Sequence, residues 1–246
     1  FGDNMDKEEI LKFYEKTINE LDPIYNDLTR SGKLDLQDNN FYLGISFVSK
    51  IIGLNSIFSD EFIKEYNLKP VVDWIDKKTV MMQASHYSDK NLFYEFFNVI
   101  FPQLKYRLSQ IKYFNSLSSE EKKRLIITPS YQVYLYKLLK NYLEQTSTEE
   151  IQKKISEILS IINLYKIVDD KNIVCLGSKI TYMDSLTNTI NYGRIVLSSH
   201  GDLSSHKLPL NKYKELISKK KEDIVMLDYS TSFFIRILDI DNSSAI

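Results

Sequence analysis

The spacing of apolar residues changes near Asp170, and this change constrains the fold more than any other feature of the sequence. Before it, apolar residues recur three and four positions apart, as on one face of an α-helix; after it, they alternate as in β-strands. The 246 residues exceed the usual domain size of about 100 to 150 residues. We therefore expect an α+β protein with an all-helical domain over 1–130, a short antiparallel helical hairpin over 131–168 and a small antiparallel β domain over 169–246.

The first 130 residues read as a series of helices. The segment 5–25 carries one apolar stripe, with Asp6 as its expected N-cap and Pro23 just beyond its expected end. The segment 39–58 is apolar on most sides, as is typical of a central buried helix. In the segment 89–114, Pro102 is expected to kink or break the helix.

Two amphipathic stripes separated by "TSTEE" (146–150) predict the hairpin. Because the connection is so short, the two helices are expected to fold back antiparallel. At ~1.5 Å per residue each arm would be on the order of 25 Å long. The stripes consist of Leu135, Leu138, Leu139, Tyr142 and Leu143 on the first helix and Ile151, Ile155, Ile158, Leu159 and Ile162 on the second.

The last part contains four short runs rich in β-branched and aromatic residues. They are bounded by Gly, Asn, Asp or Ser, a pattern typical of a small antiparallel sheet. Between the second and third runs, the segment 208–222 has helical spacing and predicts one short helix against the sheet. The runs are "NIVCLGSKITYMD" (172–184), "INYGRIVLSS" (190–199), "EDIVMLDY" (222–229) and "TSFFIRILDID" (231–241).

This order of elements resembles the bacterial Gre-factor family, including its short-hairpin relative Rnk, over roughly 130–241. Asn211 and Glu222 stand where the family usually has glycine, and about two extra residues separate Pro209 from Asp223. Nothing in the first 130 residues resembles the family. The resemblance is carried by "VCLGSKITYMD" (174–184), "SLTN" (185–188), "YGRIV" (192–196), Gly201-Asp202, "LPL" (208–210), "LISKKKEDIV" (216–225) and "FFIRILDI" (233–240).

The resemblance implies an FKBP-like β domain that binds RNA polymerase near its secondary channel, with the hairpin pointing inward. In cleavage-stimulating members, an aspartate-glutamate pair at the hairpin tip helps to hold a second Mg²⁺ at the polymerase active site, since carboxylates are hard oxygen ligands. Here it implies a regulator of transcription elongation that is not itself an enzyme and has no cofactor beyond a Mg²⁺ shared with the polymerase. The implied site residues are Glu149 and Glu150 at the tip and Gly201, Asp202, Pro209, Leu210, Lys219 and Lys220 for polymerase binding.

Glu149 and Glu150 also have a structural interpretation, which we favour. Ser147 and Glu150 match a capping box, and acidic residues in a first helical turn interact well with the helix dipole. Together with the short arms, this favours a Rnk-like regulator that does not stimulate cleavage. Glu120 and Glu121 could form a tip instead, but Ser118 with Glu121 again reads as a capping box.

The stretch "SSHGDLSSH" (198–206) brings His200, Asp202 and His206 close together in sequence. A Gly-Ser loop fixes ligands poorly, so we favour a solvated loop over partner contact, metal binding or catalysis. Ser198 and Ser199 lack the strand-turn-helix elbow of a nucleophile.

For two further clusters we favour a structural role over a binding role. The basic run 219–221 is expected to form a solvated face, with contact to an acidic partner surface as the alternative. The tyrosines at 131, 134, 136 and 142 are expected to pack in the core, with base stacking as the alternative. Trp74 and Cys175 are expected to be buried.

Composition excludes several classes of protein. The net charge of −1 gives no global electrostatic reason to expect duplex nucleic acid as a direct ligand, which leaves only local basic patches as an alternative, and the single Cys175 excludes an internal disulfide framework. No apolar run approaches the roughly 18 residues of a membrane span, so we expect a cytoplasmic protein without membrane contact.

Three other functions stay open at this stage. The helical domain could be a protein-interaction module that works without polymerase binding. The β domain could be an FKBP-like prolyl isomerase that uses Tyr229, Phe233 and Phe234. His200 and His206 could belong to a metal hydrolase.

Overall fold

The computed structural model describes residues 5–37, 39–197 and 206–244 and confirms the α+β class. The chain divides into two compact units, Phe1–Ser116 and Leu117–Ile246, each with its own hydrophobic core. This boundary precedes the predicted one at residue 130, and the hairpin and the sheet share one core. The finer division into a hairpin and a β domain stays a prediction. Among the described residues, no helix is both long and apolar enough to cross a membrane.

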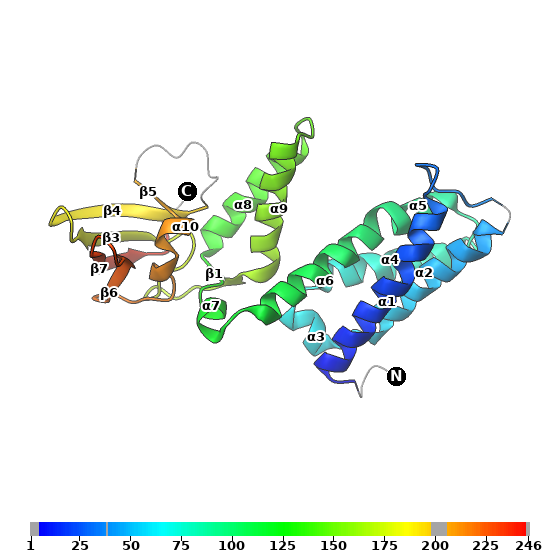
Figure 1. Ribbon diagram of the computed structural model, residues 1–246, viewed down its shortest axis with the longest axis horizontal. Coiled ribbons are helices and arrows are strands. Elements are labelled where there is room, and N and C mark those ends of the chain that lie inside the picture. Colours follow the sequence, from blue (N-terminus) through cyan, green and yellow to red (C-terminus); the bar gives the residue numbers. More distant parts are fainter. Residues whose placement is uncertain (1–4, 38, 198–205, 245–246) are drawn as a thin grey trace. The chain divides into compact units, whose positions relative to one another are not determined.

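Unit 1 is built from helices that bury one face each around an aromatic core (Figure 1). Phe47 and Phe97 stack with ring centroids 3.9 Å apart at its centre. The Tyr14 hydroxyl donates to the carbonyl of Leu104 at 2.5 Å, so a buried polar group is satisfied. The elements are α1 (Lys7–Leu28), α2 (Asn40–Ile57), α3 (Asp60–Glu65), α4 (Lys69–Ala84), α5 (Lys90–Glu95), a π-helical turn (Phe96–Ile100) and α6 (Phe101–Ser116).

The structure of unit 1 differs from three of the expectations drawn from the sequence. Asp6 caps α1 as predicted, but Pro23 lies inside this helix, which continues because residues up to Leu28 remain buried. Helix α2 is buried on one side only, and Tyr42 is 75% exposed. At Pro102, the helical path continues from α5 into α6 through the π-helical turn that precedes the proline.

Arg107 is the most unusual core residue, because it is 2% exposed and has no acidic partner among its hydrogen bonds. Its guanidinium donates to the carbonyls of Tyr66 and Asn67 and to the side chain of Gln110. Burial lowers the pKa of Arg107 to about 10. The guanidinium thus satisfies carbonyls just beyond the end of α3.

Unit 2 begins with a short helix and the hairpin and ends with a five-stranded sheet (Figure 1). The short helix predicted within 208–222 is one α-helical turn (Leu210–Tyr213) followed by a 3₁₀ turn (Lys214–Leu216). The elements are α7 (Ser119–Lys123), β1 (Ile126–Ile127), α8 (Pro129–Leu143), α9 (Glu149–Leu164), β2 (Lys166–Ile167), β3 (Lys179–Asp184), β4 (Thr189–Val196), β5 (Lys207–Pro209), α10 (Leu210–Tyr213), a 3₁₀ turn (Lys214–Leu216), β6 (Ile224–Asp228) and β7 (Phe233–Asp241).

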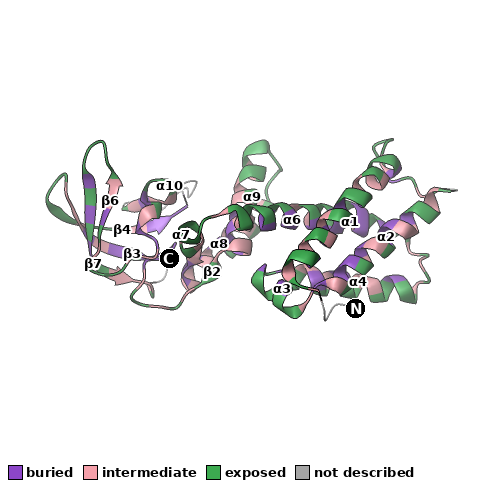
Figure 2. Ribbon diagram, turned by 60° about the horizontal axis from the view of Figure 1, so that its bottom comes forward, coloured by how far each residue is buried: buried purple, intermediate pink, exposed green. Residues whose placement is uncertain are grey.

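The sheet has the strand order β5-β4-β3-β7-β6, and one of its faces is covered. Buried and exposed residues alternate along the strands, as Figure 2 shows. All neighbouring strands are antiparallel except β4 and β5, which are parallel; the expectation of a purely antiparallel sheet was wrong there. The covered face shares its core with the hairpin and with Tyr213, Leu216 and Ile217.

The opposite face of the sheet carries apolar side chains that remain largely exposed among the described residues. Ile190, Met183, Arg236 and Ile224 are successive cross-strand neighbours on β4, β3, β7 and β6. Ile190 is 63% and Ile224 66% exposed.

Candidate partner-binding site

The base of the α8–α9 hairpin is joined to the sheet by backbone pairing. Strands β1 and β2, which lead into and out of the hairpin, pair in parallel. Leu176, just before β3, donates to the carbonyl of Ile126 at 3.0 Å and accepts from the amide of Thr128 at 3.0 Å. The two ends of the hairpin are therefore held side by side at the edge of the β domain.

Gly177 allows the first turn of α8 to approach this segment closely. Its φ of +95° lies in the region that favours glycine, and a Cβ there would lie 2.3 Å from the Cβ of Tyr131. The Tyr131 hydroxyl accepts a hydrogen bond from the amide of Leu197 at 2.9 Å. The hairpin therefore has a fixed orientation relative to the sheet.

Ser178, the second residue of the Gly-Ser pair, also has a structural role. Its hydroxyl accepts from the amide of Cys175 at 2.7 Å and donates to the side chain of Asn242, which in turn donates to the carbonyl of Ile173 at 2.8 Å. Cys175 is buried as expected, and burial raises the pKa of its thiol to about 12. Such a thiol is not a nucleophile at neutral pH.

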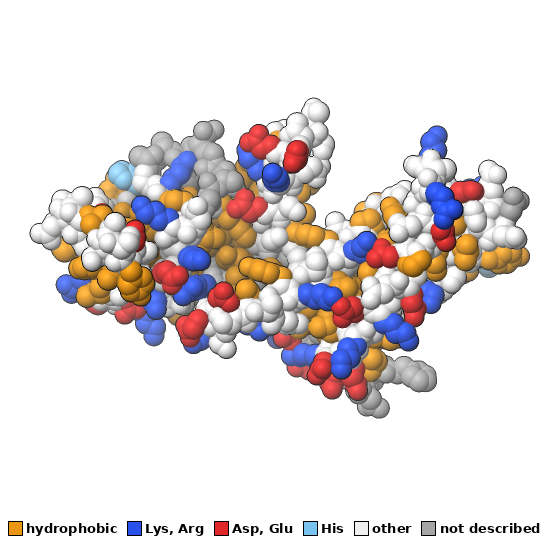
Figure 3. Space-filling view, viewed as in Figure 1, with side chains coloured by type: hydrophobic (Ala, Val, Ile, Leu, Met, Phe, Trp, Pro, Cys, Tyr) orange, Lys and Arg blue, Asp and Glu red, His pale blue; other side chains and the backbone are white. Residues whose placement is uncertain are grey.

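The hairpin tip is exposed and charged. The side chains of Glu149 and Glu150 are 90% and 79% exposed, and their carboxylates lie 3.8 Å and 3.4 Å from the ammonium groups of Lys153 and Lys154. Exposed pairs of this kind are weak, so a charged partner can replace either lysine. Figure 3 shows acidic and basic side chains intermixed over this hairpin.

The N-cap of α9 differs from the prediction. Thr148, not Ser147, is the capping residue, and its hydroxyl accepts from the amide of Ile151 at 3.2 Å. Ser147 instead accepts from the side chain of Gln152. Glu149 and Glu150 therefore occupy the first two helical positions, where consecutive side chains diverge by about 100°. They do not converge on one point, and the described residues contain no cluster of three or more His, Cys, Asp or Glu able to hold a metal ion.

The alternative tip residues lie in α7. Ser118 and Glu121 form the predicted capping box, with backbone-to-side-chain hydrogen bonds in both directions. The hydrogen bond from the Ser118 amide lowers the pKa of Glu121. Glu120 pairs with Lys123 at 3.0 Å. These carboxylates therefore stabilise a short helix.

The residues expected to bind polymerase fall into two described groups. Pro209 and Leu210 are half-buried where β5 meets α10. Lys219 is half-buried and Lys220 is exposed just before β6. The amide of Lys220 donates to the carboxylate of Asp223 at 2.8 Å, which fixes the backbone at this turn. Gly201 and Asp202 lie outside the described residues.

The structure gives the backbone conformation at Glu222 and Asn211, the two positions where the sequence pattern would have glycine. Glu222 has a φ of +75°, so the backbone there has the conformation that a glycine adopts easily. Its side chain pairs with Arg236. Asn211 is a helical residue of α10, so its position does not require left-handed backbone.

The histidine stretch gives no assembled site within the described residues. His206 is exposed, and its ring lies 4.4 Å from the ring of Tyr192 between centroids. His200 and Asp202, together with Ser198 and Ser199, lie outside the described residues.

The aromatic residues suggested for a prolyl isomerase do not line one cleft. Phe233 is 6% exposed and belongs to the core, whereas its neighbour Phe234 points to the opposite face of β7. Tyr229 is 85% exposed.

The four tyrosines expected to pack in the core do not all do so. Tyr131 is buried in the core, but Tyr136 is 51% exposed.

Comparison with known proteins finds similarity only among solved structures. One is a prokaryotic transcription elongation factor GreA/GreB from Nitrosomonas europaea, with 15% identity, a TM-score of 0.27 and coverage of 47% of this chain and 97% of that chain. Another is the GreA factor homolog 1 (Gfh1) protein of Thermus thermophilus, with 15% identity, a TM-score of 0.25 and coverage of 54% of this chain and 92% of that chain. No protein-family model and no curated protein matches the chain.

Proposed function

We propose that this protein regulates transcription elongation by binding bacterial RNA polymerase near the secondary channel. In this proposal Leu117–Ile246 is the polymerase-binding part, with an FKBP-like sheet that docks at the channel mouth and a hairpin that enters it. The observation that carries the proposal is the hairpin, whose tip is exposed and whose base is fixed to the sheet through Gly177 and Tyr131. A rigid base allows binding of the sheet to determine where the tip lies.

We further propose that the protein modulates elongation without stimulating transcript cleavage. Glu149 and Glu150 diverge around the helix and each pairs with a lysine, so they are poorly arranged to share one Mg²⁺. The helices of the hairpin have 15 and 16 residues, which gives arms of ~24 Å at ~1.5 Å per residue. The tip then acts by occupying the channel.

Binding is tested by gel filtration of the chain with bacterial core RNA polymerase. We expect co-elution, and we expect Lys219→Glu with Lys220→Glu to weaken the complex about tenfold or more, since a charge reversal opposes an acidic docking surface. Lys12→Glu with Lys16→Glu, two exposed lysines on α1 of unit 1, serves as the matched charge reversal outside the polymerase-binding part. Absence of any complex with the unmodified chain would refute the proposal.

Transcript cleavage is tested on backtracked elongation complexes with Mg²⁺ present. We expect the RNA to keep its length while elongation kinetics change. If the RNA shortens, and Glu149→Ala with Glu150→Ala abolishes the shortening while Glu120→Ala does not, the non-cleaving part of the proposal is wrong and the tip carboxylates are metal ligands.

A further inference from the structure

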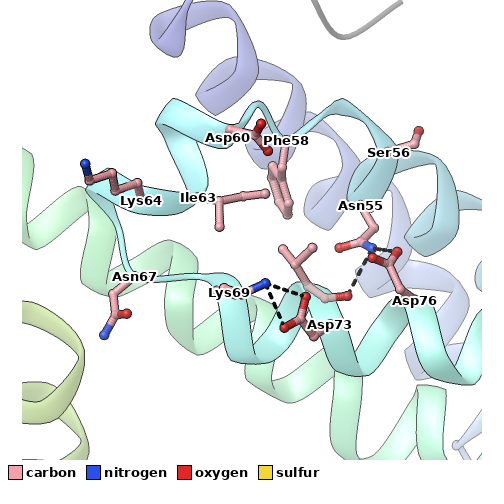
Figure 4. A pocket seen from close by; sticks show the side chains of 11 residues that line it. Asn55, Ser56, Phe58, Asp60, Ile63, Lys64, Asn67, Lys69, Asp73 and Asp76 are labelled. Atoms are coloured by element: carbon pink, nitrogen blue, oxygen red, sulfur yellow. Dashed lines mark hydrogen bonds and ion pairs between the residues drawn. The ribbon is translucent and has the colours of Figure 1, made fainter.

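A cavity of about 660 Å³ lies in unit 1 between the end of α2, helix α3 and the first turns of α4. Phe58 and Val72, each 8% exposed, and the half-buried Ile63 give it apolar walls. Figure 4 shows Phe58 and Ile63 beside the cavity, with Asn55 and Asp76 together at one end. The cavity therefore combines apolar walls with a polar end.

Asn55 is the informative residue at this polar end. Its side-chain Nδ2 donates to Asp76 Oδ1 at 2.7 Å and to the carbonyl of Val72 at 3.4 Å. Because both partners are acceptors, the amide nitrogen must face them and the amide oxygen must face the other way. Asn55 is 7% exposed, and its Oδ1 is buried without a hydrogen-bond donor among the described residues. Figure 4 shows this oxygen directed toward the apolar walls of the cavity.

The polar end presents acceptors only. Asp76 is exposed and keeps acceptor capacity beyond the one hydrogen bond from Asn55. At the rim, the ammonium of Lys69 lies 3.1 Å from the carboxylate of Asp73, so these two charges neutralise each other. An acceptor-only end next to a carboxylate selects a positively charged donor. The described residues offer no metal-binding cluster, which favours an organic cation over a metal ion.

We propose that this cavity binds a small primary amine that carries an apolar group. The ammonium donates to the Asp76 carboxylate and to Asn55 Oδ1, and the apolar group lies against Phe58, Ile63 and Val72. In this proposal a rotation about the terminal torsion of Asn55, which is broad for amides, turns Oδ1 toward the ammonium. All these residues belong to unit 1, so the site does not depend on polymerase binding.

Phenethylamine is a suitable probe, and phenethyl alcohol is its neutral counterpart. Both are titrated into the full chain, with affinity measured by calorimetry and the Asn55 side-chain amide followed by NMR. We expect saturable binding of the amine with a shift of this amide resonance. The alcohol should bind about tenfold more weakly or worse, because it lacks the charge-assisted hydrogen bonds.

Two variants separate recognition from general electrostatics. Asp76→Asn should lower the amine affinity about tenfold or more, whereas Asp60→Asn, which removes the same charge at the cavity rim, should change it less than about threefold. Both residues are exposed, and an unchanged NMR spectrum elsewhere confirms that the fold is kept. The proposal is overturned if binding of phenethylamine is not saturable or if phenethyl alcohol binds equally well. It is also overturned if Asp76→Asn and Asp60→Asn lower the affinity for the amine equally.

Discussion

Tyr131 and Gly177 determine, at the scale of single residues, how the hairpin sits on the sheet. The ring of Tyr131 is buried in the core of unit 2, and its hydroxyl accepts a hydrogen bond from the amide of Leu197. Gly177 leaves the space that this ring occupies. The glycine was visible in the sequence as part of the Gly-Ser pattern. The tyrosine was expected only as core, because a stripe of four tyrosines does not show which hydroxyl meets a backbone amide.

Tyr131→Phe should destabilise unit 2 by about 1 to 3 kcal/mol at pH 7, since a buried N–H loses its acceptor. Burial raises the pKa of Tyr131, so the folded state keeps the hydroxyl protonated while the unfolded chain ionises above about pH 10. The stability that Tyr131 provides is present below that pH and declines above it. The difference in free energy of unfolding between the unmodified chain and the variant should therefore become smaller above about pH 10.

Urea unfolding at several pH values, followed by circular dichroism, measures this difference. Tyr136→Phe is the matched control, because Tyr136 is 51% exposed on the same helix. It should change stability by less than about 0.5 kcal/mol. A Tyr131→Phe variant as stable as this control would contradict the assigned role.

Helix α9 shows, at the scale of elements, how a cap determines the start of a helix. Thr148→Ala should cost about 1 kcal/mol locally and speed hydrogen exchange of the Ile151 amide roughly fivefold, because this amide loses the Thr148 hydroxyl. Ser147→Ala should leave the exchange of Ile151 nearly unchanged. Equal effects of the two substitutions would show that the cap is shared.

The elements that the sequence predicted well are those with long amphipathic periods. Helices α1, α8 and α9 follow from their apolar stripes, and the change of period near Asp170 precedes the sheet. The misses have different causes. Ser147 and Thr148 are both common N-cap residues by type, and tertiary packing lets α1 continue through Pro23. The parallel pairing of β5 is a long-range property of the sheet that no local pattern records.

The sites were harder to predict than the elements. The tip carboxylates of Glu149 and Glu150 are exposed, and each pairs with a lysine one helical turn further on, a pairing that was not predicted from the sequence. Asn55 and Asp76 are 21 positions apart, on different helices, and meet only through the packing of α2 on α4. The residue types alone gave no signal for this cavity.

The whole molecule consists of two units, each with its own core. We therefore expect the fragments 1–116 and 117–246 to fold separately, since each retains its buried apolar cluster. Calorimetry should show one cooperative transition for each fragment. If the polymerase proposal holds, only 117–246 should co-elute with the enzyme. A fragment that is unfolded on its own would show that the cores are not independent.

The paired strands β1 and β2 give the hairpin the properties of an insert with adjacent ends. Because the hairpin begins and ends at these two paired strands, the length of its arms is uncoupled from the geometry of the five-stranded sheet. Adding one heptad to each helix would lengthen the arms by about 10 Å without disturbing Gly177 or Tyr131. If the polymerase proposal holds, the depth that the tip reaches is therefore an adjustable length, while the surface of the sheet that docks stays the same.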